Sequence, residues 1–123
     1  MPSTVVLVVD DDPVILKLLI VNFELEGYEL CSATQGAEAL EVARERRPDV
    51  VVSDIMMPIM SGLDLVVAMK ADPDLALIPV LLLSAKAQAA DIRAGLQAGA
   101  ADYVTKPFEP LDLVSRVEAV LNR

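Results

Sequence analysis

The chain of 123 residues contains no histidine and no tryptophan, and its only cysteine is Cys31. Without histidine it can form neither the usual kind of zinc site nor a Ser-His-Asp triad. One cysteine permits no disulfide within the chain, so we expect Cys31 to be a small buried hydrophobic residue. Because aromatic residues make up only 3% of the chain, its core must consist of aliphatic side chains and methionine.

Basic residues are also scarce, with 10 lysines and arginines against 19 aspartates and glutamates. The net charge of −9 argues against direct nucleic-acid binding and against attachment to an anionic membrane, because both surfaces are negative. An acidic protein can still bind metal cations. The longest apolar run, residues 75–83, contains a proline and is too short to span a bilayer, and the N-terminus shows no signal-type segment. We therefore expect a cytoplasmic protein.

Hydrophobic residues are abundant, at 54% of the chain, and they alternate between two periods. Short runs rich in β-branched residues predict strands over residues 5–9, 28–33, 49–53, 79–84 and 101–105. Stretches with apolar residues at helical spacing predict helices over residues 13–26, 36–46, 61–71, 87–98 and 110–122. This alternation predicts a single α/β domain over residues 1–123, with a parallel sheet covered on both faces.

The composition of the five apolar runs predicts the strand order. The first, third and fourth runs are continuously apolar, as central strands buried on both faces must be, whereas the second and fifth mix polar with apolar residues, as edge strands do. A doubly wound, flavodoxin-like sheet of order 2-1-3-4-5 fits this division. Gly27 and Gly99 follow two of the helices and are expected to be left-handed caps.

Three carboxylates follow the first strand in "VVLVVDDDPVIL". Asp12 precedes Pro13, the pattern of a helix N-cap followed by proline at the first helical position, so we expect Asp12 to be structural. Asp10 and Asp11 remain at the end of that strand, and Asp54 follows the neighbouring third run. The first and third strands flank the point at which the strand order reverses, and doubly wound sheets bind ligands there. Because three clustered carboxylates repel one another, a hard divalent cation such as Mg²⁺ is the expected ligand.

Two further strand ends carry groups that complement these acids. The fourth strand ends at Ser84, and Lys106 follows the fifth strand on the same edge of the sheet. A hydroxyl, a cation and a metal can together neutralise the oxygens of a phosphoryl group. Each residue alone would more often be a helix cap or a solvated charge. Their joint occurrence at four strand ends of one sheet predicts phosphoryl chemistry.

The segments "VVDDDP", "SDIMMPIMSG", "LLLSA" and "ADYVTKPF", in this order on five βα units, resemble the receiver domain of two-component response regulators. The resemblance covers essentially the whole chain. It implies that Asp54 is the phosphoacceptor, that Asp11 binds Mg²⁺ directly, and that Asp10 acts on the metal mainly through water. It also implies that Met56 contributes its backbone carbonyl to the metal.

The same resemblance implies which residues carry the response. Ser84 would be the hydroxyl that moves to the phosphoryl group, Lys106 its charge partner, and Tyr103 an aromatic residue whose pose changes with the phosphorylation state. Structural roles in these loops fall to three residues: Pro58 and Gly62 after the phosphoacceptor, and Pro107 in a cis peptide with Lys106.

A receiver domain also implies partners. The donor would be a phosphohistidine on a sensor histidine kinase or a phosphotransfer protein, because this chain has no histidine. The output would be a changed surface on the fourth helix, fifth strand and fifth helix, read by an effector domain or protein or used to form a homodimer. We therefore expect a signalling switch rather than an enzyme. Such a switch catalyses only its own phosphorylation and dephosphorylation.

Two alternatives remain open. A metal-dependent phosphohydrolase can use an aspartyl-phosphate on a related sheet, but a resemblance to such enzymes would imply an Asp-x-Asp nucleophile after the first strand and usually a cap domain. Asp54 instead follows the third strand. A pseudo-receiver that only binds partners would have lost Asp11, Asp54 or Lys106, and all three are present.

Overall fold

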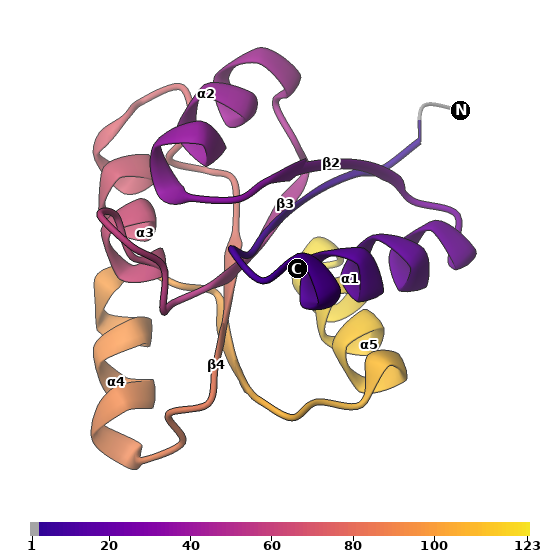
Figure 1. Ribbon diagram of the computed structural model, residues 1–123. Coiled ribbons are helices and arrows are strands. Elements are labelled where there is room, and N and C mark those ends of the chain that lie inside the picture. The colour runs from indigo at the N-terminus through magenta and orange to yellow at the C-terminus, as the bar shows by residue number, and fades with distance from the viewer. Residues whose placement is uncertain (1–2) are drawn as a thin grey trace.

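The computed structural model describes residues 3–123, in which five strands and five helices alternate along the chain (Figure 1). The strands are β1 (Val5–Val9), β2 (Glu29–Ala33), β3 (Val50–Asp54), β4 (Val80–Ser84) and β5 (Asp102–Thr105). The helices are α1 (Pro13–Leu25), α2 (Gly36–Arg46), α3 (Gly62–Ala71), α4 (Ala89–Ala98) and α5 (Pro110–Leu121). Residues 1 and 2, which the expected domain 1–123 includes, lie outside the described residues.

The five strands form one parallel sheet of order β2-β1-β3-β4-β5, which confirms the predicted topology. The register places Val9 of β1 beside Ser53 of β3, and Ser84 of β4 beside Thr105 of β5. The carboxyl ends of these strands therefore meet at one edge of the sheet. Sheets of this topology bind ligands at that edge.

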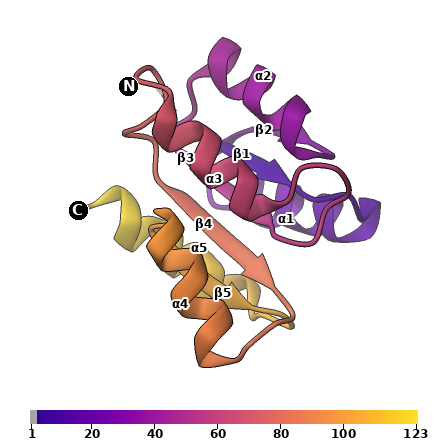
Figure 2. The same cartoon turned by 90° about the vertical axis from the view of Figure 1, so that its left-hand side faces the viewer.

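Helices cover both faces of the sheet. α2, α3 and α4 lie on the face that Figure 2 turns towards the viewer, and α1 and α5 lie on the other (Figures 1 and 2). Leu7 and Leu82 belong to the core layer on the first face, whereas Val8 and Leu81 belong to the layer on the second. The alternation of side chains along each central strand thus divides the aliphatic core into two layers.

Burial distinguishes the central strands from the edge strands, as expected. Every residue of β3 and β4 is buried, whereas β2 contains both exposed and buried residues. Cys31 lies in β2 as a buried free thiol, which agrees with the expected role as a small hydrophobic residue. In the part of the chain that the structure describes, no helix combines the length and the apolar character that crossing a bilayer requires.

The turn from β1 into α1 follows the predicted pattern. A side-chain oxygen of Asp12 accepts a hydrogen bond from the Val14 N–H at 2.9 Å, and Pro13 is the first helical residue. Gly27 and Gly99 have φ angles of 90° and 117°, in the left-handed region expected of residues that end helices. Asp12 is therefore a structural residue.

Two element bounds differ from the prediction in an informative way. α4 begins at Ala89, two residues later than expected, because the Lys86 N–H bonds to the Ser84 hydroxyl and holds the preceding segment in a loop. β3 begins and ends one residue later than expected, so Asp54 is its last residue. The other bounds agree with the prediction to within one residue.

Candidate functional site

Three aspartates converge at the carboxyl edge of the sheet. Asp10 and Asp11 follow β1, Asp54 ends the adjacent strand β3, and one carboxylate oxygen of each lies within 4.8 Å of the others. Asp10 and Asp54 are buried, with 1% and 5% of their surfaces exposed, whereas Asp11 is exposed. The structure therefore brings together the three acids that the topology predicted to be neighbours, with Asp11 on the solvent side.

Lys106 bridges the two buried carboxylates. Its Nζ lies 3.1 Å from Oδ2 of Asp10 and 3.1 Å from Oδ1 of Asp54. The Lys106 N–H donates to the Ser84 carbonyl at 2.8 Å, which ties the start of its loop to the end of β4. The Lys106–Pro107 peptide is cis, as the family resemblance implied. The lysine thus contacts the acids themselves. The sequence predicted only that Lys106 lies on the same edge of the sheet as these acids.

The ionisation of Asp54 and that of Lys106 depend on each other. Burial raises the pKa of Asp54 and the charges of Asp10 and Asp11 raise it further, against the lowering effect of Lys106. Burial lowers the pKa of Lys106, but its hydrogen bonds to Asp54 and Asp10 and their charges outweigh burial and hold this pKa above its ordinary value. Lys106 therefore stays positive at neutral pH, and the site disfavours the ionised form of Asp54.

Ser84 and Tyr103 are linked through the backbone of Lys86. The Ser84 hydroxyl is fully buried and accepts a hydrogen bond from the Lys86 N–H at 3.1 Å. The Tyr103 hydroxyl donates to the Lys86 carbonyl at 2.8 Å, and the tyrosine ring is buried. Sequence reasoning missed this junction, because it uses an N–H and a carbonyl that every residue except proline would supply at position 86.

Gly62 shapes the loop between β3 and α3. A Cβ at Gly62 would collide with the carbonyl oxygen of Asp54 and would lie 2.9 Å from the Cα of Ile55. The Gly62 N–H donates to the Ile55 carbonyl at 2.9 Å. Met56 and Pro58 are exposed in this loop. No hydrogen bond in the described part of the chain uses the Met56 carbonyl oxygen, so this oxygen is available as a ligand.

The sequence and the fold both match known proteins. A model of the response regulator receiver domain family matches residues 6–118. The chain belongs to this family. PrrA of Mycobacterium tuberculosis, a transcriptional regulatory protein, is 49% identical over 119 residues, and MtrA of Mycolicibacterium smegmatis, a DNA-binding response regulator, is 42% identical over 118 residues. Each match covers 96% of this chain and 50% of the relative, so the chain spans about half the length of these relatives.

Solved structures of response regulators have the same fold as this receiver domain. A putative response regulator from Chloroflexus aurantiacus superposes with a TM-score of 0.94 at 35% identity, over 99% of this chain and 100% of that chain. The chemotaxis response regulator CheY4 of Vibrio cholerae gives a TM-score of 0.91 at 32% identity, over 97% and 99%. The chain is thus the receiver domain of a two-component response regulator, and the phosphohydrolase alternative is not favoured.

The acidic cluster of this receiver domain fits a magnesium ion. Its donors are carboxylate oxygens of Asp10, Asp11 and Asp54, the hard ligands that Mg²⁺ prefers. Three carboxylates against the single ammonium of Lys106 leave negative charge uncompensated, and a divalent cation neutralises it. The exposed position of Asp11 leaves one side open for the waters that Mg²⁺ retains.

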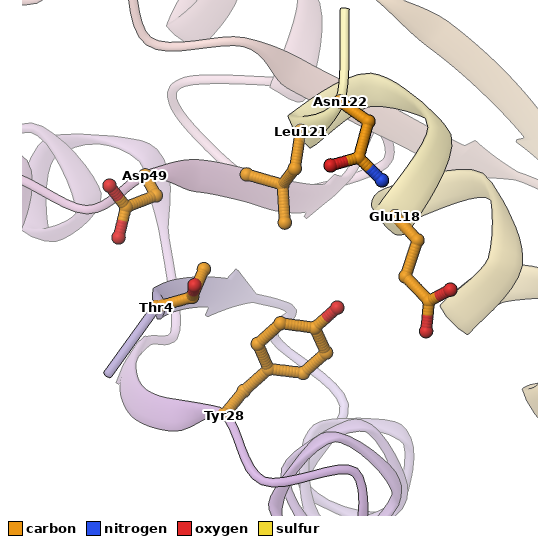
Figure 3. A pocket seen from close by; sticks show the side chains of 6 residues that line it. All are labelled: Thr4, Tyr28, Asp49, Glu118, Leu121 and Asn122. Atoms are coloured by element: carbon orange, nitrogen blue, oxygen red, sulfur yellow. The ribbon is translucent and has the colours of Figure 1, made fainter. Parts of the chain in front are cut away.

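A separate hollow lies at the opposite end of the sheet. It encloses about 350 Å³ and is lined by Thr4, Tyr28, Asp49, Glu118, Leu121 and Asn122 (Figure 3). Oδ2 of Asp49 accepts a hydrogen bond from the Val5 N–H at 2.8 Å, so this carboxylate holds backbone in place. Among the described residues, only the carboxyl edge gathers three acidic groups closely enough to share an ion.

Proposed function

We propose that Asp54 accepts the phosphoryl group in this receiver domain. The observation that carries the proposal is the convergence of three carboxylates with Lys106, whose Nζ holds Oδ1 of Asp54 at 3.1 Å. Oδ2 of Asp54 forms no hydrogen bond with any of the described residues. A carboxylate oxygen positioned in this way is a suitable nucleophile for phosphorus.

The transfer consists of one in-line displacement. Oδ2 of Asp54 attacks the phosphorus of a phosphohistidine on another protein, the P–N bond breaks, and the imidazole nitrogen keeps the electron pair. Lys106 donates to a phosphoryl oxygen and stabilises its charge. Asp11, Asp54 and the Met56 carbonyl would hold Mg²⁺, with Asp10 acting through water, and the ion would supply positive charge to neutralise the phosphoryl oxygens. The product is an acyl phosphate on Asp54.

The response begins at Ser84. Its hydroxyl leaves the Lys86 N–H and donates to a phosphoryl oxygen, so the loop between β4 and α4 loses one of its hydrogen bonds. Tyr103 is bonded to the carbonyl of the same Lys86 and changes its pose with the loop. The surface formed by α4, β5 and α5 then differs between the two states, and an effector or a second copy of the domain reads that difference.

The phosphodonor docks against α1. Exposed apolar side chains follow one another at spacings of four, three and four residues, which places them on one face of the helix: Val14, Leu18, Val21 and Leu25. A hollow of about 330 Å³ beside this face is lined by Pro107, Phe108 and Lys106. Because Lys106 also contacts Asp54, a helical kinase or phosphotransfer domain lying along α1 can bring its phosphohistidine to the acidic cluster.

The output is the regulation of transcription. PrrA is named a transcriptional regulatory protein and MtrA a DNA-binding response regulator, and this chain matches half of each. With a net charge of −9, the receiver domain is unsuited to DNA, so contact with DNA falls to an effector domain. Such a regulator works in the cytoplasm. The receiver has no separate substrate and modifies only itself, so it acts as a switch.

Labelling by acetyl phosphate in the presence of Mg²⁺ tests the phosphoacceptor. We expect no stable label in Asp54→Asn, slower labelling in Asp11→Asn because Mg²⁺ binds more weakly, and the parent rate in Asp49→Asn. Asp49 is the matched control, because it directly precedes β3 at the opposite end of the sheet, whereas Asp54 is the last residue of that strand. A stable aspartyl label in Asp54→Asn would overturn the assignment.

A further inference from the structure

Gly95 lies inside α4, where a glycine weakens a helix relative to alanine. It is the buried residue of this helix, and it faces the side chains of β4 and β5. A Cβ at Gly95 would lie 2.8 Å from Cδ2 of Tyr103 and 3.2 Å from Cδ1 of Leu82. In proteins, a Cβ atom essentially never comes within 3.0 Å of a heavy atom from a residue that is not its chain neighbour. The buried ring of Tyr103 therefore occupies the space that a side chain at position 95 would need.

This contact ends a continuous path from the phosphoryl site to α4. The Ser84 hydroxyl accepts from the Lys86 N–H at 3.1 Å, and the Lys86 carbonyl accepts from the Tyr103 hydroxyl at 2.8 Å. The Tyr103 ring then lies against the bare backbone of Gly95. Figure 2 shows α4 beside β5 on one face of the sheet, so the path runs from a strand end to the helix that covers it.

We propose that Gly95 is a positioning residue for the switch: its missing side chain admits Tyr103 to the buried pose and so couples α4 to Ser84. The packing part of this proposal stands on the contacts alone. Its consequence for phosphoryl binding rests on the proposed function of Ser84 and Asp54.

A side chain at position 95 displaces Tyr103 rather than Leu82. Leu82 belongs to β4, which is buried along its whole length between two other strands. Tyr103 belongs to the edge strand β5, and its hydroxyl reaches the exposed loop that contains Lys86. The ring therefore has a route outwards, whereas Leu82 has none.

Displacement of Tyr103 weakens binding at the phosphoryl site. Once the Ser84 hydroxyl leaves the Lys86 N–H for the phosphoryl group, the backbone of Lys86 keeps one side-chain hydrogen bond among the described residues, which comes from the Tyr103 hydroxyl. Without the hydrogen bond from Tyr103, the loop between β4 and α4 is free to move until the phosphoryl group binds. Binding must then order the loop, which costs conformational entropy. Because coupling between sites is reciprocal, a change at position 95 alters the affinity for a phosphoryl mimic.

The packing is tested without any ligand. The chain has two tyrosines and no tryptophan, so in a Tyr28→Phe variant all tyrosine fluorescence comes from Tyr103. In this background, Gly95→Ala should raise the quenching of tyrosine fluorescence by acrylamide, because the ring becomes exposed. Gln97→Ala, an exposed position on the same helix, should leave quenching unchanged. Unchanged quenching in Gly95→Ala overturns the proposal, whatever the domain does with phosphate.

The coupling is tested with beryllofluoride and Mg²⁺, followed by amide resonances. Gly95→Ala should raise the half-saturating concentration about fivefold or more, the lower range of measured couplings between sites. The same substitution in a Tyr103→Ala background should have no further effect, because the collision is gone. An equal effect with and without the tyrosine ring overturns the proposal. Failure of the parent to bind beryllofluoride contradicts the proposed function instead, and the quenching result still decides the packing.

A second variant covers a loss of folding. If Gly95→Ala alone fails to fold, the Gly95→Ala, Tyr103→Ala double variant should regain the fold, since it removes the one collision that involves the tyrosine ring. A double variant that remains unfolded overturns the proposal.

Discussion

The two ends of the sheet use aspartate in opposite ways. At the amino end, Asp49 precedes β3 and bonds to the Val5 N–H, beside the hollow shown in Figure 3. At the carboxyl end, Asp54 closes the same strand, is buried, and shares Lys106 with Asp10. Both aspartates belong to one short segment, yet one stabilises backbone and the other is held among like charges.

This difference shows that surroundings, rather than residue type, separate the two aspartates: one accepts a backbone hydrogen bond, and the other lies buried among carboxylates. A carboxylate that accepts backbone hydrogen bonds lowers the free energy of the fold. Carboxylates brought together in a buried site raise it unless a cation is present. The carboxyl end of the sheet therefore gives up stability that a bound divalent cation can restore.

The largest expected effect comes from removing the cation of the carboxyl end. Lys106→Met leaves Asp10 and Asp54 buried without a positive partner, so we expect the free energy of unfolding without Mg²⁺ to fall by about 3 kcal/mol. Denaturant unfolding at pH 7 measures the change. Lys17→Met, on the exposed side of α1, is the control and should have almost no effect. A loss no greater than in this control would contradict the role of Lys106.

A smaller effect of opposite sign is expected from Asp54→Asn. Because folding raises the pKa of Asp54, ionised Asp54 subtracts stability as the pH rises above its unfolded pKa near 3.8. Asparagine cannot ionise, so we expect Asp54→Asn to raise the free energy of unfolding at pH 7, by less than Lys106→Met lowers it. The gain should vanish as the pH falls below 3.8, where the parent carboxyl is protonated in both states.

Asp49→Asn is the matched measurement at the amino end. Asparagine keeps an oxygen that can accept from the Val5 N–H, so we expect no gain in stability from this change. Thermal unfolding of both variants over a range of pH separates the two ends of the sheet. Equal behaviour of Asp54→Asn and Asp49→Asn would remove the distinction between them.

The smallest expected gain in stability concerns backbone strain at the two ends of the sheet. Ile59, in the loop before α3, has a φ of 70°, and Arg47, after α2, has a φ of 46°. The left-handed region disfavours β-branched side chains most, and Ile59 is fully exposed, so its side chain contributes no burial. We expect Ile59→Asn to stabilise the domain by about 1 kcal/mol and Arg47→Asn by less, as measured by denaturant unfolding. A larger gain at Arg47 would show that strain is not concentrated near the site.

The fold and the acidic cluster were predictable because they depend on side-chain patterns. Continuous apolar runs distinguished β1, β3 and β4 as central strands, and parallel strands necessarily place Asp10, Asp11 and Asp54 at one edge. The N-cap at Asp12 and the glycine at Gly99 followed from local rules that the structure confirms.

The features that could not be predicted depend on main-chain hydrogen bonds and on the space left by a missing side chain. The junction at Lys86 uses an N–H and a carbonyl that leave no pattern in the sequence. The fit of Gly95 against Tyr103 is visible only once the helix is placed on the sheet. The two contacts of Lys106 with Asp10 and Asp54 likewise required the distances, because a strand order specifies an edge but not which atoms meet there.

In the proposed function, the carboxyl edge directs a phosphoryl group to Asp54 with the help of Mg²⁺. Mass-spectrometric peptide mapping of the parent protein after treatment with acetyl phosphate tests it most directly. We predict one phosphoryl group per chain, located on Asp54, when Mg²⁺ is present, and almost none when EDTA removes it. A phosphoryl group on any other residue, or an equal yield without Mg²⁺, would contradict the claim.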